Sequence, residues 1–75
     1  MPKIQRYLGE AFDSQDELRI ISALAIQGSE RAVVIANRTH LDTFFVCEAL
    51  TRLEGRGFVK VVGERLGEQV FGLKS

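Results

Sequence analysis

The side chains of this sequence that could do covalent or metal chemistry are few and widely spaced. There is one cysteine, Cys47, and one histidine, His40, with no second residue of either type to complete a zinc site or a disulfide. No Ser/His/Asp or Cys/His set stands in a supporting context, and the glycines of "GERLGE" fit a hairpin turn better than a nucleotide-binding loop. We therefore expect a protein that is not an enzyme and that holds no metal or cofactor.

Cys47 and His40 each have an ordinary structural explanation beside a functional one. Cys47 is either an inert small side chain or a redox sensor, and its acidic neighbour Glu48 does not favour the sensor. His40 stands in a predicted turn, where it either faces solvent and caps the chain or contacts a phosphate group.

Length and charge limit the class of protein. The chain has 75 residues, enough for one small domain with a marginal core, and many such domains gain stability by forming homodimers. Ten Lys and Arg balance ten Asp and Glu, so the sequence lacks the basic excess usual in nucleic-acid binders. No apolar run is long enough to span a membrane, and "MPKIQRYLGEAF" lacks a signal-peptide core, which favours a cytoplasmic protein.

The elements that must position any functional residue begin with a helix. Apolar spacing predicts it from Gln15 to Gln27, with Ser14 and Glu17 at the spacing of a capping box and Gly28 as its C-terminal stop. The preceding segment, 1–13, could form a further helix, which would pack on the domain's own core or contact a second subunit. Its apolar residues stand at i, i+4 and i+8: Ile4, Leu8 and Phe12.

The next segment has two interpretations. The run Ala32–Ala36 is β-branched enough for a strand by local preference. Alternatively, Ser29 could cap a short helix over Glu30 to Arg38. The context of the following helix favours the second interpretation, so we expect Arg31 to Asn37 to be helical.

Helical spacing returns at Asp42, the predicted N-cap of a third helix that runs to Glu54. Its apolar stripe follows i, i+3, i+4 and i+7: Val46, Ala49, Leu50 and Leu53. Gly55 and Gly57 allow the chain to reverse. Two β-rich runs, "FVKVV" and "QVFGLK", then flank a linker from Gly63 to Glu68 and predict a β-hairpin.

The junction between the third helix and the hairpin, "EALTRLEGRGFVKVV", resembles the winged helix-turn-helix domains of MarR and ArsR repressors. There a Leu-x-x-Leu-Glu-x-x-Gly pattern and an apolar pair join helix to wing, and the matching positions here are Leu50, Leu53, Glu54, Gly57, Phe58 and Val59. Ile35-Ala36 matches the Leu-Ala pair of the family's second helix, and Asp42 matches the first residue of its third. The resemblance covers 14–73. It implies a single α+β domain over 1–75, with a three-helix core over 14–54 and a C-terminal β-hairpin wing over 58–74.

The resemblance also implies a homodimeric transcriptional regulator that reads double-stranded DNA with its third helix and wing. Candidate contacts lie on the outer face of that helix and where winged helices touch phosphates: Arg38, His40, Thr43, Phe44, Cys47, Thr51 and Arg65. Arg38 lies between the second and third helices and Arg65 at the predicted wing tip. Each could instead simply solvate the surface.

The two adjacent phenylalanines keep a second function open. We place Phe44 on the outer face and Phe45 on its flank; an exposed Phe44 would contact a thymine methyl group or pack on another subunit or protein. With a shifted register, Phe44 would be core and Phe45 would lie outside. The alternative function is therefore a protein-protein interaction module anchored by one of them. The third helix has a formal charge of −2, a poor match to a duplex, from Arg52 against Asp42, Glu48 and Glu54.

Overall fold

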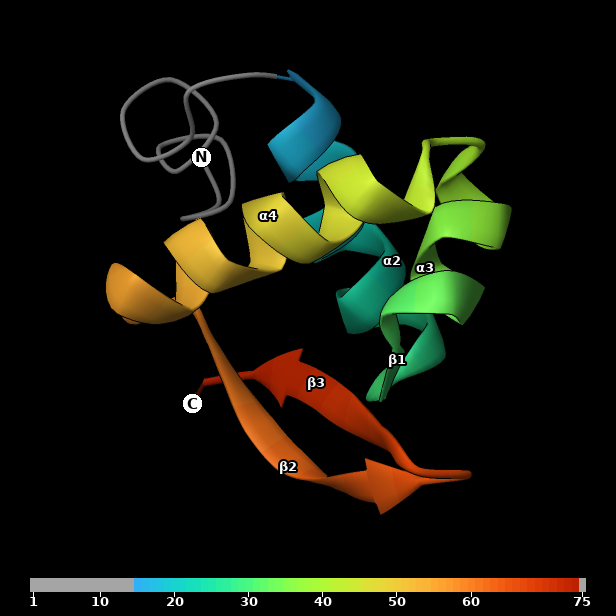
Figure 1. The fold of residues 1–75 in the computed structure, drawn as a ribbon. Coiled ribbons are helices and arrows are strands. Elements are labelled where there is room, and N and C mark those ends of the chain that lie inside the picture. The colour runs from blue at the N-terminus through green and yellow to red at the C-terminus, as the bar shows by residue number, and fades with distance from the viewer. Residues whose placement is uncertain (1–14, 75) are drawn as a thin grey trace.

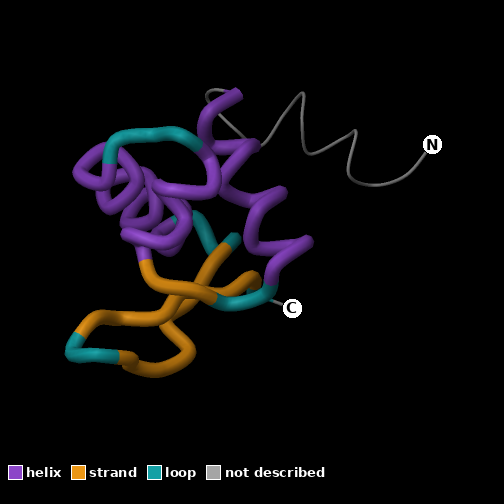
Figure 2. Tube along the Cα trace, turned by 90° about the vertical axis from the view of Figure 1, so that its right-hand side faces the viewer, coloured by secondary structure: helices purple, strands orange, loops and turns teal. Residues whose placement is uncertain are grey.

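A computed structural model describes residues 15–74, which form three helices and a small antiparallel sheet (Figure 1). The element expected over 1–13 and the predicted helix cap at Ser14 lie outside the described residues. The helices lie together on one side, and the hairpin extends beneath them, as Figure 2 shows. The order is α2 (Gln15–Gln27), β1 (Glu30–Arg31), α3 (Ala32–Thr39), α4 (Thr43–Gly55), β2 (Val59–Arg65) and β3 (Glu68–Leu73).

Helix α2 spans the range that its apolar spacing predicts. It supplies Ile20 and Leu24 to the core, where they are 0% and 3% exposed. The helix stops at Gly28, which takes a positive φ of 86° and donates its N–H to the carbonyl of Leu24 at 2.9 Å. A glycine adopts this left-handed conformation without the steric cost of a Cβ.

The chain before α3 corrects one prediction. Ala32 to Asn37 are helical as expected, but Glu30 and Arg31, also expected in that helix, form strand β1. They pair antiparallel with β3, and this long-range pairing decides the conformation of a strand only two residues long. The N-cap of α3 is therefore Arg31, in extended conformation, and not Ser29.

A tight turn joins α3 to α4. His40 takes a left-handed conformation at φ 60° and donates its backbone N–H to the carbonyl of Ala36. Asp42 caps α4 as predicted, because its carboxylate accepts the N–H of Phe45 at 3.2 Å. This helix-turn-helix unit fixes where α4 leaves the turn and which of its sides faces the core.

The predicted apolar stripe of α4 is wholly buried: Val46, Ala49, Leu50 and Leu53 are each 0% exposed. It joins residues from the other helices and the sheet in one core, namely Ile20, Leu24, Ala32, Ile35, Ala36, Val59 and Phe71. Because this stripe faces inward, the opposite side of α4 faces solvent.

The sheet has the strand order β1-β3-β2 and is antiparallel throughout. β2 begins at Val59 and not at Phe58 as expected, because the Phe58 N–H still bonds the helix carbonyl of Leu53 at 2.9 Å. A bulge interrupts the pairing between Val61 and Gly63. Within residues 15–74, no helix is long and apolar enough to cross a membrane.

The hairpin turn is shorter than the predicted linker from Gly63 to Glu68. Arg65 stands opposite Glu68, and only Leu66 and Gly67 connect them. Both connecting residues have positive φ, 54° and 79°, as in the type I′ turns that close two-residue hairpins. After its first residue every position of β2 is exposed, so the hairpin extends away from the core as a wing.

Candidate nucleic-acid interface

Four of the predicted contact residues share one exposed stripe of α4. Thr43, Phe44, Cys47 and Thr51 are all exposed, and steps of three and four place them side by side on the helix, away from the buried stripe. We call these four residues the outer stripe. It offers hydroxyl groups, a thiol and an aromatic ring, which make hydrogen bonds or apolar contacts and carry no fixed charge.

The two phenylalanines lie as expected. Phe44 is 71% exposed, whereas Phe45 is partly buried and packs against the core. The interpretation in which a shifted register makes Phe44 a core residue is therefore wrong. A ring as exposed as that of Phe44 does little for the fold, which makes it the strongest contact candidate on the helix.

A hydrogen bond inside the outer stripe limits what Thr51 can do. Its hydroxyl donates to the backbone carbonyl of Cys47 at 3.0 Å. The hydroxyl proton is therefore occupied, and Thr51 offers a partner its methyl group and the lone pairs of its oxygen. Cys47 is a free, exposed thiol.

An ion pair that sequence reasoning missed holds α4 against α2. The carboxylate of Glu17 is 1% exposed and accepts from Nε of Arg52 at 3.2 Å. Arg52 itself is about half exposed, on the flank of α4. The pair removes Arg52 from the charges available to a partner. The local sequence assigns Glu17 to a capping box. Nothing in that local sequence indicates that Glu17 pairs with Arg52, which lies 35 positions away.

Two further candidates lie at the turn between α3 and α4: Arg38, which is in the last turn of α3 and not between the helices as expected, and His40, the residue that ends α3. Arg38 and His40 line one shallow depression with α2, and His40 and Thr43 line another between α3 and the start of α4. All three side chains are exposed. His40 connects Arg38 to the outer stripe, so six of the seven predicted contacts form one continuous surface.

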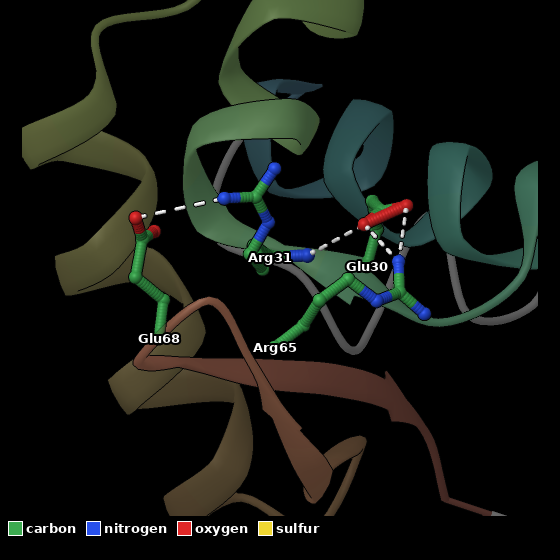
Figure 3. Close-up of polar contacts among 4 residues, drawn as sticks. All are labelled: Glu30, Arg31, Arg65 and Glu68. Atoms are coloured by element: carbon green, nitrogen blue, oxygen red, sulfur yellow. Dashed lines mark hydrogen bonds and ion pairs between the residues drawn. The ribbon is translucent and has the colours of Figure 1, made fainter.

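Arg65 is the one predicted contact that does not belong to this continuous surface. Its Nη1 lies 3.0 and 3.4 Å from the two carboxylate oxygens of Glu30 (Figure 3). A second pair joins the same two parts of the chain, because Nη1 of Arg31 lies 3.6 Å from an oxygen of Glu68. Two ion pairs therefore fasten the end of the wing to β1.

These pairs determine which positive charges remain available. Arg31 is mostly buried, and Arg65 is about half exposed but bound to Glu30. Sequence reasoning could not find these pairs, because β1 itself was expected to be helical. Within residues 15–74, the cationic side chains that form no ion pair and stack on no ring are Arg38, Lys60 and Lys74.

Comparison with known proteins concerns the sequence and the fold of the chain. No protein-family model matches the chain, and no curated protein matches it significantly. Among solved structures, the chain is similar to the Zalpha domain of PKZ from Carassius auratus, solved in complex with Z-DNA. That match has 30% identity, covers 79% of this chain and 92% of that one, and has a TM-score of 0.72.

Two bacterial structures show the same fold at lower identity. One is the homodimeric winged helix-turn-helix DNA-binding domain of a possible ArsR-family regulator from Mycobacterium bovis, at 22% identity over 97% of this chain and 66% of that one, TM-score 0.77. The other is a MarR family regulator from Neisseria meningitidis, at 17% identity over 93% of this chain and 51% of that one, TM-score 0.74. The three helices and the antiparallel sheet with its hairpin wing match the fold of these winged helix domains. The chain belongs to the winged helix-turn-helix domains.

Proposed function

We propose that the chain is a DNA-binding transcriptional regulator that reads duplex DNA with α4 and the wing. The outer stripe would meet base edges, while the turn before α4 and the wing would meet the phosphate backbone. The contact residues of this proposal are Arg38, His40, Thr43, Phe44, Cys47, Thr51 and Arg65.

The observation that carries the proposal is the exposed, uncharged outer stripe on a helix whose other side is fully buried. A helix about 10–12 Å across fits a major groove about 12 Å wide. In that groove the ring of Phe44 suits a thymine methyl group, and the threonine oxygens suit amino groups on base edges. Similarity to domains described as bound to Z-DNA and as DNA-binding supports the same function.

In this proposal, contacts with phosphate groups contribute little to the affinity for DNA. Arg38 is the one candidate contact that is permanently cationic and without an ion pair among the described residues. Each phosphate contact steepens the slope of log affinity against log salt by about 0.9. A shallow slope, with selectivity resting on apolar and hydrogen-bonding contacts, is therefore the expected behaviour.

The regulator would act as a homodimer. A domain of 75 residues has a small core and commonly gains stability from a second copy. The similar domain from Mycobacterium bovis is described as homodimeric. Two copies related by a twofold axis would read two half-sites about one helical turn of DNA apart.

One observation favours a second candidate function, a protein-protein interaction module. Phe44 is 71% exposed on a helix that, together with its cap Asp42, has a formal charge of −2, and large exposed aromatic side chains are typical anchors of protein interfaces. In this alternative Phe44 fills a pocket on a protein partner, and the acidic side chains around it select a basic rim.

The experiment begins with selection of a preferred duplex from a random pool, followed by titration of that duplex at several salt concentrations. Arg38→Ala should weaken binding and lower the salt slope by about one unit. Lys74→Ala is the matched control, because Lys74 is also exposed and unpaired within the described residues but lies at the base of the wing, outside the proposed contact surface. Failure to enrich any duplex, with no binding at low salt, would refute DNA binding and favour the interaction module.

A further inference from the structure

Two large aliphatic side chains contribute nothing to the core of the domain. Leu66, at the tip of the wing, is 81% exposed, and Ile26, near the end of α2, is 78% exposed. Neither belongs to the hydrophobic core or packs against it. A single exposed aliphatic residue is common on a protein surface, so each of the two must be judged by its surroundings.

The backbone of Leu66 is unfavourable for a leucine. Its φ of 54° is in the left-handed region, which leucine rarely adopts because its Cβ approaches the following carbonyl oxygen. Asn, Asp or Gly normally occupies this first position of a type I′ turn. An asparagine would close the same hairpin with less strain and without exposed apolar surface. A leucine at this position indicates a contact made outside the domain.

The charges beside Leu66 leave the wing tip acidic. Figure 3 shows the Arg65 side chain running toward Glu30, where its Nη1 lies 3.0 Å from the carboxylate. Glu68, on the other side of the turn, is paired with strand β1. Glu64 forms no ion pair within residues 15–74. The wing tip therefore presents an apolar side chain and one unpaired negative charge.

Ile26 lies at the shallow depression between α2 and the end of α3, which we call the α2–α3 depression. Its volume of about 430 Å³ exceeds the roughly 150 Å³ of a cavity that holds benzene, so a leucine side chain can enter it. Leu18 and Ala23 extend its apolar lining. Its titratable lining residues are all basic: Arg19, Arg38 and His40.

The wing tip and the α2–α3 depression are complementary in charge and in polarity. An apolar side chain with an unpaired carboxylate faces water on the one, and an apolar lining with an unpaired guanidinium, that of Arg38, faces water on the other. Leu66 does not line the depression of its own copy, so a second copy must supply the wing tip. The formal net charge of zero gives no general repulsion between copies.

We propose that the wing tip of one copy docks in the α2–α3 depression of a second copy, with Leu66 against Ile26 and Glu64 beside Arg38. Arg38 and His40 are also contacts of the proposed DNA site, and the docked tip covers both. Self-association through the wing therefore competes with duplex binding. This consequence, and not the docking itself, rests on the proposed function. The contact is distinct from the homodimer that would read two half-sites, because it covers residues which that homodimer needs.

The first test follows the methyl signals of Leu66 and Ile26 by NMR while the purified chain is diluted. One leucine and one ion pair bury far less than the roughly 1,200 Å² of a standard interface, so we expect a dissociation constant on the order of 0.1–1 mM. Leu66→Asn should raise this constant about tenfold without lowering the melting temperature, because asparagine suits the turn. Val33→Asn is the control, since Val33 is apolar and 41% exposed but lies on neither surface.

A charge exchange tests which surfaces meet. Glu64→Arg and Arg38→Glu should each weaken self-association, because each places like charges together. An equimolar mixture of the two variants should associate again, since arginine at position 64 of one copy then meets glutamate at position 38 of the other. Glu48→Arg, which changes the net charge equally on α4, should have no effect.

The outcomes separate the docking from the proposed function. Methyl signals that do not change on dilution, association that Leu66→Asn leaves intact, or a mixture that fails to associate would each overturn the docking. Adding the selected duplex should disperse the associated copies. Copies that stay associated through Leu66 on the duplex would overturn the competition. Self-association without binding to any duplex would support the docking and refute the proposed function.

Discussion

Alanine replacement of the two adjacent phenylalanines should separate folding from binding. Phe44 is 71% exposed, so less than a third of its surface can lose contact in Phe44→Ala. With roughly 1.5–3 kcal/mol for complete burial of such a side chain, the expected loss of unfolding free energy is about 0.5 kcal/mol. Phe45 packs against the core but is only partly buried, which puts Phe45→Ala near 2 kcal/mol, below the roughly 3–5 kcal/mol of a fully buried phenylalanine.

Thermal melts and a binding titration measure both effects. At about 4–8 °C per kcal/mol for a domain of this size, Phe44→Ala should lower the melting temperature by about 2–4 °C and Phe45→Ala by about 8–16 °C. Phe44→Ala should nonetheless weaken binding to the selected duplex. A loss above about 2 kcal/mol at Phe44, or equal losses at the two positions, would refute the assignment of Phe44 to a binding surface.

Three other substitutions test how the structure holds the site. Asp42→Ala removes the acceptor that caps α4 and should cost about 1 kcal/mol of stability in chemical denaturation. Arg52→Ala takes the guanidinium from the buried carboxylate of Glu17 and should cost about 1–2 kcal/mol, and Glu17→Gln in the same chain should restore part of that stability. Glu30→Gln should free the guanidinium of Arg65 and raise the affinity for the duplex. Arg65→Ala in the same chain should abolish this gain in affinity. A gain that persists without Arg65 would show that Glu30 acts by general charge repulsion instead.

Apolar periodicity and turn chemistry were sufficient to predict most of the fold. The spacing of Leu50 and Leu53 with their neighbours located the buried side of α4, and that in turn located the outer stripe. Asp42 marked the start of the same helix, because a cap acts on the backbone within one turn. These features depend on residues close together in the chain, which is why the sequence alone displays them.

Features that depend on distant partners could not be predicted in the same way. Strand β1 is two residues long, and its conformation follows from pairing with β3, some forty positions later. The pairs of Glu17 with Arg52 and of Glu30 with Arg65 are unrecognisable until α4 and the wing fold back on the first half of the domain. Their consequence for the site is considerable, because they engage two arginine side chains that charge counting alone would treat as free.

The central claim is that the outer stripe of α4 contacts the bases of duplex DNA. The most direct measurement is titration of the selected duplex into isotopically labelled chain, with backbone amide shifts followed by NMR. The claim predicts the largest changes at Thr43, Phe44, Cys47 and Thr51, with smaller ones at the turn before α4 and at the tip of the wing. Saturable binding with changes confined to α2 and none along the outer stripe would contradict it.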